Sequence, residues 1–514
     1  MFATVQSAKP KDQIKWEKLK EKFNFLNGII SYIIKYIENC SIHGLHFLIK
    51  DGLTLFERLF WLILVILSQY FCVYIAMSSV YIYQTKNTHV GIERDFYFWN
   101  TSLPSVTICP MKRIDDEKFD EFCDRNDIVL DRKKTLRDFL EQLANSTYIN
   151  FKYLPDYGSI YRTLDKLNVK PQQYMELIYN VTADMTSNPI DMYRARCIHD
   201  NANIKVRQVL TEYGLCYLTN NYLGQKYTSS FLIYGQYPDI NPFEAKKPFR
   251  KILSGSFFDK DVSYTFIGFP ESIDLFVHSP YDVMKVDSNF GYAEDHLEFD
   301  PVTMEIVTGT GFDEASVRQR HCRFPHESNL THFPIYTKNI CLQECRLNLV
   351  YKTCKCIPHF YPNRFGKPKA VCDYRTLKEC VGQYADQFLK IFVVNSAKDV
   401  ENMSNQKLKK APCYCDQNCE DSVVTIQAVH RYLLVYVQVM LSSKPLLGSI
   451  GAQVSMKTWP RQRLKRIIIF NFSDLLVYIG GTAGLFMGFS VLGALEVVYF
   501  FTLRLLFHLL GYKL

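Results

Sequence analysis

The chain lacks the patterns that mark most soluble enzymes and nucleic-acid-binding proteins. Its net charge of +8 is modest for 514 residues, and it has no basic stripe, C2H2 spacing or RNP-like run. It contains no nucleophile elbow, metal-binding histidine pair or phosphate loop, so His278 and His321 stand alone as candidate bases. These absences exclude a nucleic-acid partner and argue against an enzyme.

Charge is also missing from two long segments near the ends of the chain. Leu59–Tyr83 and Leu475–Leu495 carry no charged residue, and apolar character continues after Glu496 to Leu510. About 20 apolar residues suffice to cross a bilayer as a helix. We therefore expect two transmembrane helices, at residues 59–83 and 474–510. Residues 1–22 are lysine-rich and show no cleavable signal peptide, so the first helix would serve as the insertion signal.

The cysteines set the orientation of these two spans. All but two of the 16 cysteines lie between the spans, and an even number in one large loop predicts disulfides, which need an oxidising compartment. Residues 84–473 are therefore expected outside the cell, with residues 1–58 and 511–514 in the cytosol. The excess of Lys and Arg in residues 1–58 agrees with this orientation, which is that of a two-span plasma-membrane protein.

Asparagine glycosylation sequons are consistent with an extracellular loop. Such tripeptides are weak signals one by one, and a seventh, at Asn39, is expected to stay unmodified in the cytosol. The candidate sites in the loop are Asn100, Asn145, Asn180, Asn329, Asn402 and Asn471.

Local periodicity predicts an α+β extracellular domain. Apolar residues alternate at Ile273, Leu275 and Val277, and the short apolar run 432–443 shows the same strand pattern. The stretch Thr337–Lys352 looks helical, and residues 395–411 form the likeliest insertion.

The cytosolic segment contains one further helical pattern. Apolar residues recur at helical spacing over residues 26–37. This stretch is too short and too polar to span a bilayer. It fits either an amphipathic helix at the inner membrane surface or a helix packed on protein.

The extracellular cysteines fall into two groups. The spacing of the second group suggests a nested ladder, because Cys341 and Cys345 would share a helix face and Cys413 and Cys415 a strand face. Spacing does not prove pairing, and a zinc site is the competing interpretation, which an extracellular setting disfavours. The groups are Cys109, Cys123, Cys197 and Cys216, and then Cys322, Cys341, Cys345, Cys354, Cys356, Cys372, Cys380, Cys413, Cys415 and Cys419.

The second apolar segment is unlike a simple anchor. Gly480, Gly484 and Gly488 recur every four residues, a spacing that puts them on one helix face, and Glu496 lies further along. A carboxylate at membrane depth by default lines water or meets a partner. The alternatives are that the glycine stripe is a packing face, which is the more common case, and that Glu496 snorkels to the membrane surface. The segment is longer than a bilayer requires, so it must tilt, break or project, and glycines offer places to break. Several copies around an axis would turn backbone carbonyls and the Ser490 hydroxyl toward a shared pore.

The chain resembles the epithelial sodium channel/degenerin family, and within it the insect pickpocket and Nach-like branch. The resemblance covers nearly the whole chain and depends on motifs that occur together in this order. They are His43-Gly44, Leu103-Pro-Ser-Val-Thr-Ile-Cys109-Pro110, Tyr213-Gly-Leu-Cys216-Tyr, Val277-His-Ser-Pro280, Gln319-Arg320-His-Cys322, the ten-cysteine cluster, Asp474-Leu-Leu-Val-Tyr-Ile-Gly-Gly481 and Gly484-Leu-Phe-Met-Gly-Phe-Ser490-Val-Leu-Gly-Ala-Leu-Glu496.

This resemblance implies a sodium-preferring channel blocked by amiloride and built as a homo- or heterotrimer with related subunits. Its extracellular domain would be a hand of β palm, helical thumb and helical finger. No cofactor or metal is implied beyond permeant sodium, and the extracellular stimulus is not specified. The implied disulfides are Cys109–Cys216, Cys322–Cys419, Cys341–Cys415, Cys345–Cys413, Cys354–Cys380 and Cys356–Cys372, with Cys123–Cys197 left over.

The resemblance also assigns roles to individual residues. Gly488-Phe489-Ser490 match the selectivity tripeptide of the family, and Phe489 is expected to point away from the pore axis. His43-Gly44 match its cytosolic gating motif. Val477 falls where bulky residues hold degenerin-type pores open. The family also places Gly480, Gly484 and Glu496 along the pore helix.

Two other two-span classes share this topology. A scavenger-receptor-like protein would bind lipid through a large glycosylated domain, but it does not explain a helix combining the glycine repeat, Ser490 and Glu496. An ATP-gated channel is disfavoured because its motifs near the first span are absent. The run Arg463-Leu-Lys-Arg466 resembles a protease site, and we interpret it as a membrane-proximal basic patch.

Overall fold

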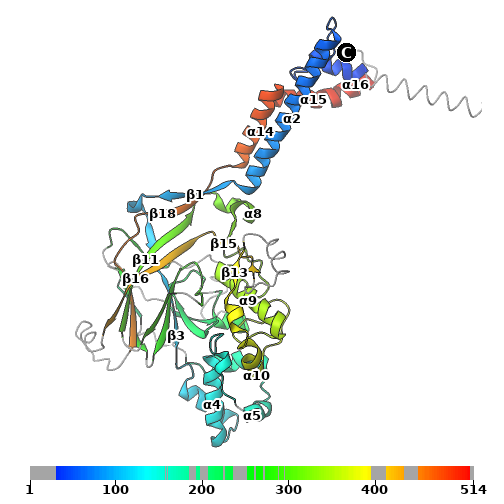
Figure 1. Cartoon of the computed structure of the whole chain (residues 1–514). Coiled ribbons are helices and arrows are strands. Elements are labelled where there is room, and N and C mark those ends of the chain that lie inside the picture. Colours follow the sequence, from blue (N-terminus) through cyan, green and yellow to red (C-terminus); the bar gives the residue numbers. More distant parts are fainter. Residues whose placement is uncertain are drawn as a thin grey trace, which may run out of the picture. The chain divides into compact units, whose positions relative to one another are not determined.

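The fold is described from a computed structural model of the chain (Figure 1). The structure describes residues 31–156, 158, 160–183, 193–196, 206–223, 226–235, 252–259, 262–269, 272–286, 289–293, 296–394, 412–432 and 450–509. Several expectations lie outside these residues: the partner cysteine Cys197, the sequon at Asn402, the insertion at 395–411, the tail at 511–514 and nearly all of the strand pattern 432–443.

The described chain divides into two compact units. The first combines residues 1–89, 318–320 and 468–514, and the second combines residues 90–317 and 321–467. The first unit therefore joins segments from the two ends of the sequence. The second contains most of the expected extracellular domain.

The first unit is helical. Its longest helix, α2 (Leu55–Thr85), contains the predicted span 59–83 and extends beyond it at both ends. The helix begins with a capping box, in which Glu57 N–H donates to Thr54 Oγ1 at 3.4 Å and Thr54 N–H to the Glu57 carboxylate at 2.7 Å. The other helices are residues 31–39, η1 (His46–Leu48), α14 (Phe472–Met487), α15 (Val491–Tyr499), η7 (Phe500–Arg504) and α16 (Leu505–Leu509).

The two predicted spans differ in whether a single helix of each is long and apolar enough to cross a membrane. Among the described residues, α2 alone is long and apolar enough as a single helix to cross a bilayer. The second segment meets the same criterion only when Phe472–Met487 and Val491–Phe507 are taken together, and these two helices are bent by 74°. The over-long second segment is thus broken rather than straight.

The second unit contains two larger β-sheets. In one, β11 (His296–Thr308) is central: it pairs antiparallel with β16 (Asp421–Tyr432) and parallel with β17 (Ile450–Met456) and β18 (Arg463–Ile468). This sheet has the order β1-β18-β11-β17-β8-β4, with β16 added on β11, and its remaining strands are β1 (Thr88–Glu93), β8 (Val262–Phe269) and β4 (Tyr193–Arg196).

The other large sheet is antiparallel throughout and has the order β10-β9-β3-β6-β5. Its strands are β10 (Asn289–Ala293), β9 (Ile273–His278), β3 (Ser105–Pro110), β6 (Gly214–Thr219) and β5 (Val206–Thr211). The predicted alternation on β9 is confirmed, since Ile273, Leu275 and Val277 all lie in one buried cluster that also includes residues of β8, β11 and β17. Three short pairs complete the β structure: β2 (Asn100–Ser102) with β7 (Ser254–Ser256), β12 (Cys322–Arg323) with β15 (Gln417–Asn418), and β13 (Phe392–Val393) with β14 (Pro412–Cys413).

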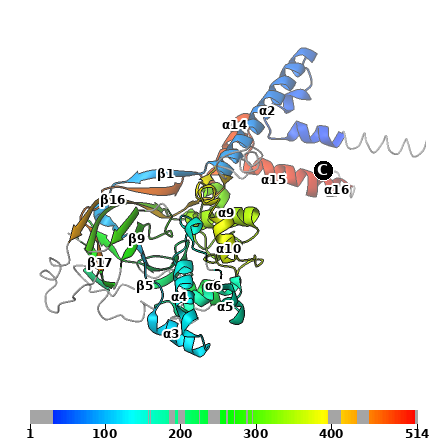
Figure 2. The same ribbon diagram turned by 60° about the horizontal axis from the view of Figure 1, so that its bottom comes forward.

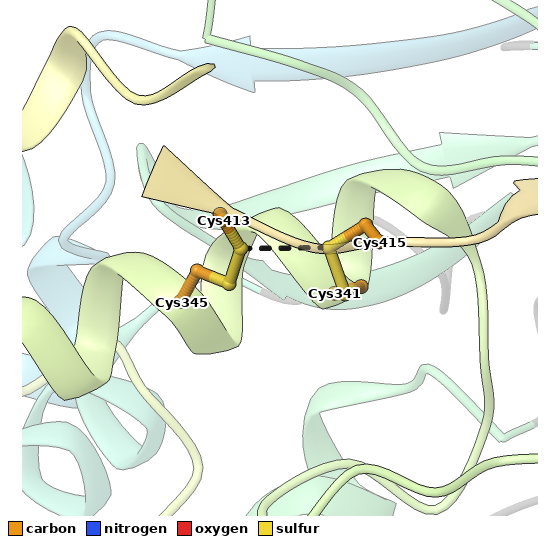
Figure 3. Close-up of side chains that lie close together, drawn as sticks. All are labelled: Cys341, Cys345, Cys413 and Cys415. Atoms are coloured by element: carbon orange, nitrogen blue, oxygen red, sulfur yellow. Dashed lines mark hydrogen bonds between the residues drawn. A yellow bond between two sulfur atoms is a disulfide. The ribbon is translucent and has the colours of Figure 1, made fainter. Parts of the chain in front are cut away.

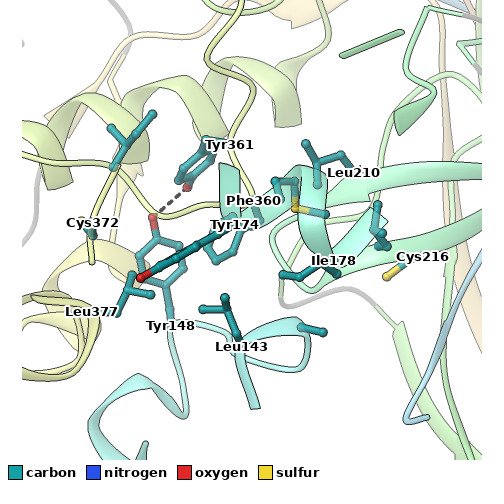
Figure 4. Packing of buried hydrophobic residues seen from close by; sticks show 14 of the residues in the cluster. Leu143, Tyr148, Tyr174, Ile178, Leu210, Cys216, Phe360, Tyr361, Cys372 and Leu377 are labelled. Atoms are coloured by element: carbon teal, nitrogen blue, oxygen red, sulfur yellow. Dashed lines mark hydrogen bonds between the residues drawn. The ribbon is translucent and has the colours of Figure 1, made fainter. Parts of the chain in front are cut away.

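Helices surround a second, larger core in this unit. Tyr148, Tyr174, Phe360 and Tyr361 pack there with Cys216 and aliphatic side chains (Figure 4). The helical elements are η2 (Phe96–Phe98), α3 (Asp116–Arg125), α4 (Leu130–Ala144), η3 (Phe151–Tyr153), α5 (Ile160–Lys166), η4 (Pro171–Gln173), α6 (Tyr174–Val181), α7 (Ser229–Tyr234), η5 (Phe312–Glu314), α8 (Val317–Arg320), α9 (Lys338–Cys354), α10 (Tyr374–Thr376), η6 (Leu377–Val381) and α11 (Ala385–Leu389).

The predicted helix at 337–352 is confirmed as α9. Thr337 caps it, its hydroxyl accepting a hydrogen bond from Ile340 N–H at 3.2 Å. It ends where Lys355 takes a left-handed conformation, with φ of 62°.

One buried ion pair ties α9 to the turn between β5 and β6. Arg346 donates two hydrogen bonds to the carboxylate of Glu212, at 2.7 and 2.8 Å. Tyr361 donates to the same carboxylate at 2.5 Å, and its hydroxyl lies 2.8 Å from that of Tyr148 (Figure 4). The charge of Arg346 is therefore matched in a site from which water is excluded.

Six disulfides reinforce this unit: Cys109–Cys216, Cys322–Cys419, Cys341–Cys415, Cys345–Cys413, Cys354–Cys380 and Cys356–Cys372. These are the pairings implied by the family resemblance. Cys123 is buried, and because Cys197 lies outside the described residues, their bridge stays a prediction. The cluster that suggested zinc, Cys341, Cys345, Cys413 and Cys415, is bridged here and so offers no thiolate.

The basic run at 463–466, interpreted above as a membrane-proximal basic patch, has an acidic partner in the structure. It forms strand β18, where Arg463 and Lys465 both pair with Glu93, at 2.6 and 3.0 Å. Arg463 also lies over the ring of Trp99 at 4.4 Å. The sequence suggested a patch because Glu93 is distant along the chain.

The two candidate histidine bases lie in different surroundings. His278 is buried on β9, with Nε2 2.8 Å from Thr107 Oγ1 and Nδ1 3.0 Å from the Ser279 carbonyl oxygen. Burial lowers the pKa of His278 to about 4, so the ring is neutral at pH 7. His321 is exposed, in a turn with φ of 53°.

Candidate functional site: the break in the second apolar segment

The break between α14 and α15 falls on Gly488-Phe489-Ser490. Gly488 ends α14 in the left-handed region, with φ of 63°, and its N–H donates to the Gly484 carbonyl oxygen at 2.9 Å. Ser490 then begins α15, its hydroxyl accepting a hydrogen bond from Gly493 N–H at 3.1 Å. Glycine tolerates the left-handed angle and serine is a favoured N-cap, so the tripeptide itself encodes the bend (Figure 2).

The segment around His43 packs directly against this break. The N–H of His43 donates to the carbonyl oxygen of Met487 at 3.0 Å. A Cβ added to Gly488 would lie 2.0 Å from Nδ1 of His43, so the imidazole occupies the space that a side chain at 488 would need. The sequence motifs at 43–44 and 488–490 are therefore in contact.

Gly44 allows the turn that carries His43. Its φ of 90° is one that residues with a side chain rarely adopt, and an added Cβ would lie 2.9 Å from Cγ2 of Val65 on α2. Residues 43 and 44 therefore form a tight turn that packs against α2.

Further contacts hold α14 beside α2. The hydroxyl of Ser68 donates to the Phe486 carbonyl oxygen, and the rings of Phe71 and Phe486 stack with centroids 6.4 Å apart. At the other end, Tyr83 meets Phe470 and Phe472, at 6.3 and 6.4 Å between centroids. Carbonyl groups released by the end of α14 are thus partly satisfied by this neighbouring helix and the His43 turn.

Beyond the break, the helix at residues 31–39 packs on the C-terminal helices. Tyr36 contacts Phe500 and Phe501, each at 5.1 Å between centroids, and Tyr32 joins the same buried cluster. Ile33 and Ile34, expected on the apolar face, are 40% and 39% exposed. The described part of this helix therefore packs on protein, which was one of the two alternatives. The contacts are made by tyrosines, which the isoleucine periodicity did not single out.

The glycine stripe needs a correction. Gly480 and Gly484 lie within α14, but Gly488 follows its last residue, Met487, and turns left-handed, so the third glycine ends the helix instead of continuing a packing face. A Cβ on Gly480 would meet nothing within 4 Å, whereas one on Gly488 would strike His43. Gly480 faces open space in the single chain, and Gly488 provides the left-handed residue at the bend.

The remaining predicted residues lie along the same helices. Val477 on α14 is 71% exposed. Phe489 lies against α15, with its Cδ2 3.7 Å from the position of a Cβ on Gly493, and Glu496 is half-buried on α15. No sequence pattern singled out Ser41, whose hydroxyl lies 3.1 Å from that same Cβ position.

The fold and this broken segment define a class: a membrane protein with an apolar helix at one end, a bent apolar helix pair at the other and a disulfide-rich domain between them in sequence. The family model described as amiloride-sensitive sodium channel matches residues 36–500. The chain therefore belongs to the amiloride-sensitive sodium channel family, whose members are membrane ion-transport proteins and are generally oligomeric.

Three insect relatives cover most of the chain. Pickpocket protein 28 of Drosophila melanogaster is 20% identical over 92% of this chain and 78% of its own length. Pickpocket protein 19 of the same species is 23% identical over 78% of this chain and 76% of its own length. Sodium channel protein Nach of Drosophila ananassae is 22% identical over 90% of this chain and 85% of its own length.

Proposed function

We propose that this chain is a subunit of a sodium-preferring, amiloride-sensitive cation channel of the plasma membrane, opened by an extracellular stimulus. Three related or identical subunits would surround the pore. Residues 59–83 and 474–510 would cross the membrane, residues 84–473 would form the extracellular palm, thumb and finger, and residues 1–58 and 511–514 would be cytosolic.

The observation that carries this proposal is the break at Gly488-Phe489-Ser490. A helix that only anchors a protein has no need of a left-handed glycine and a new N-cap in mid-segment. The break frees backbone oxygens and the Ser490 hydroxyl from continuous helix geometry, and oxygens around a common axis can replace part of the hydration shell of Na+. The packing of Phe489 against α15 is consistent with a ring that leaves the ion path open.

We infer the roles of Glu496, Val477 and the His43-Gly44 turn from their positions. Glu496 lies further along the same segment, where its negative charge would favour cations. Val477, exposed on α14, would face the same helix of a neighbouring subunit. The His43-Gly44 turn would act on the break from the cytosolic side, through the bond between His43 and Met487.

Two-electrode voltage clamp tests the proposal. Cells expressing the chain, alone and with related subunits, should show an inward sodium current that amiloride blocks. Glu496→Gln should lower this current and Glu496→Asp should lower it less, with surface biotinylation as the expression control. Absence of any such current in every subunit combination that reaches the surface would contradict the proposal.

A further inference from the structure

Two disulfides lie side by side between α9 and the segment 413–415, which starts at the last residue of β14. Cys341–Cys415 and Cys345–Cys413 bring all four sulfur atoms within 4.8 Å of one another (Figure 3). The sulfurs of Cys413 and Cys415, which belong to different bridges, are 3.7 Å apart. Each of these two sulfurs therefore has a second sulfur close by that is not its own partner.

Access to the cluster is uneven. Cys341, Cys413 and Cys415 are buried, at 6%, 3% and 4% exposure, whereas Cys345 is only partly buried. Disulfides exchange when a thiolate attacks one sulfur and the other leaves as a thiolate. A small thiol from solvent would therefore reach Cys345 first, and Cys413 would be the leaving group.

We propose that these two bridges exchange partners under a small extracellular thiol, converting two bridges between α9 and the segment 413–415 into one bridge within each segment. In the first step the thiolate bonds to Cys345 Sγ, and the electron pair of the broken bond leaves on Cys413. In the second, the Cys413 thiolate attacks Cys415 Sγ and releases Cys341 as a thiolate. In the third, Cys341 attacks Cys345 and expels the original thiolate.

The three steps balance without an oxidant or a reductant. Two disulfides are present before and after, and the attacking thiol is regenerated. The products are within reach: residues i and i+4 of a helix have Cα atoms about 6.2 Å apart. Cys415 follows the end of β14, and even in a fully extended chain the Cα atoms of residues i and i+2 are only about 6.6 Å apart. Both values fall near the upper end of the range that a disulfide spans, so the exchanged form should be the less populated one.

The exchange would remove the covalent link between α9 and β14. β14 would then be held by its pairing with β13 and by its chain neighbours, and α9 would have no covalent tie to it at this cluster. The bond from Lys338 N–H to Asn418, at 2.8 Å, would remain at the start of α9.

Peptide mapping under non-reducing conditions tests the exchange on the purified full-length protein. In the native pairing, the tryptic fragment Asn339–Arg346, which contains Cys341 and Cys345, is bound to the fragment that contains Cys413 and Cys415. After incubation with reduced glutathione and acid quenching, we expect a fraction of Asn339–Arg346 to be released with an internal disulfide, two hydrogens lighter than the dithiol. Release only as the dithiol, or no release at all, would overturn the proposal.

A variant tests the second step without added thiol. Cys345→Ser leaves Cys413 unbridged beside Cys415, so Cys413 should compete with Cys341 for Cys415. Denaturation in N-ethylmaleimide should then label Cys341 in one fraction of molecules and Cys413 in the rest. The matched control is Cys354→Ser, which leaves Cys380 without its disulfide partner. Among the described residues, neither belongs to a close sulfur group. Of the cysteines in the six disulfides, Cys380 alone should therefore become labelled, beside Cys40 and Cys72, which are unbridged in every variant. Labelling confined to Cys413 in the first variant would contradict the exchange.

Discussion

The N–H of His43 donates a hydrogen bond to the carbonyl oxygen of Met487 at 3.0 Å, at the residue immediately before the left-handed Gly488. This bond joins residues from opposite ends of the chain. It makes the His43-Gly44 turn and the break in the second apolar segment one packed structure. A change in either should therefore alter the other.

Gly44→Ser should lower the open fraction of the channel. A side chain at a φ of 90° costs about 1–2 kcal/mol, and the new Cβ would press on Val65. If the conducting state uses this turn, the open/closed ratio falls by about 5- to 30-fold. Single-channel recording measures this ratio directly.

Gly52→Ser is the matched control for Gly44. Gly52 has an almost identical φ of 89°, but a Cβ there would meet nothing within 4 Å. It should share the backbone strain without disturbing Val65 or His43. Equal loss of open probability in both variants would show that the effect is not specific to the turn at the break.

Val477→Phe should raise the resting, amiloride-sensitive current. The side chain is 71% exposed on α14, where added bulk would hold the helices of neighbouring subunits apart. Leu476→Phe, at a position 55% exposed on another side of the helix, should do less. An unchanged resting current in Val477→Phe complexes that conduct would refute this assignment.

Glu212→Gln should destabilise the extracellular domain by about 3–5 kcal/mol, because it leaves the Arg346 guanidinium buried without its partner. The double variant Glu212→Leu with Arg346→Met should lose much less than the sum of the two single changes, since it removes both charges. Thermal unfolding in detergent provides the comparison. Additive losses would show that the pair acts independently rather than as a unit.

Asp282 should make stability depend on pH. Burial and the nearby carboxylate of Asp421 raise the pKa of Asp282 from 3.8 to about 7. Between those values the folded protein binds more protons than the unfolded chain. The contribution of this group is therefore fully present below about pH 4 and is lost as pH rises to about 7.

Asp282→Asn should flatten this decline in the melting temperature between pH 4 and pH 7. The exposed Asp156, which pairs with Lys378 at the surface, provides the control, and Asp156→Asn should keep the wild-type profile. A wild-type profile in Asp282→Asn would mean that another group is responsible.

Patterns with local causes could be read from the sequence. Thr54 and Glu57 cap the uncharged run that becomes α2, Thr337 caps α9, and period-two alternation marks β9. A helix cap or an alternating strand is decided by neighbours within a few residues. These elements needed no knowledge of the rest of the fold.

What the sequence could not supply depends on distant contacts. Gly488 looked like the third member of a helical stripe, and only its positive φ and the ring of His43 show that it ends the helix. Likewise the sequence shows Arg463 only as part of a basic run, whereas in the structure it pairs with Glu93. Such partners are separated by hundreds of residues, and no periodicity encodes them.

Mutagenesis can separate the observed role of the Ser490 hydroxyl from its proposed role. It caps α15 through Gly493, so Ser490→Ala loses a helix cap, worth about 1 kcal/mol, as well as an oxygen facing the proposed ion path. Ser490→Asn keeps a cap but presents a different group. Thr482→Val provides a control, because the Thr482 hydroxyl bonds within its own helix to Tyr478 at 2.7 Å.

The central claim, that Gly488-Phe489-Ser490 selects the permeant ion, is tested most directly by reversal potentials. They should be measured with sodium and potassium exchanged outside cells whose channels are shown to contain this subunit. The account predicts that Ser490→Ala and Ser490→Asn both change the sodium/potassium permeability ratio, whereas Thr482→Val does not. Reversal potentials unmoved by every Ser490 substitution would contradict it and leave the break as a structural bend.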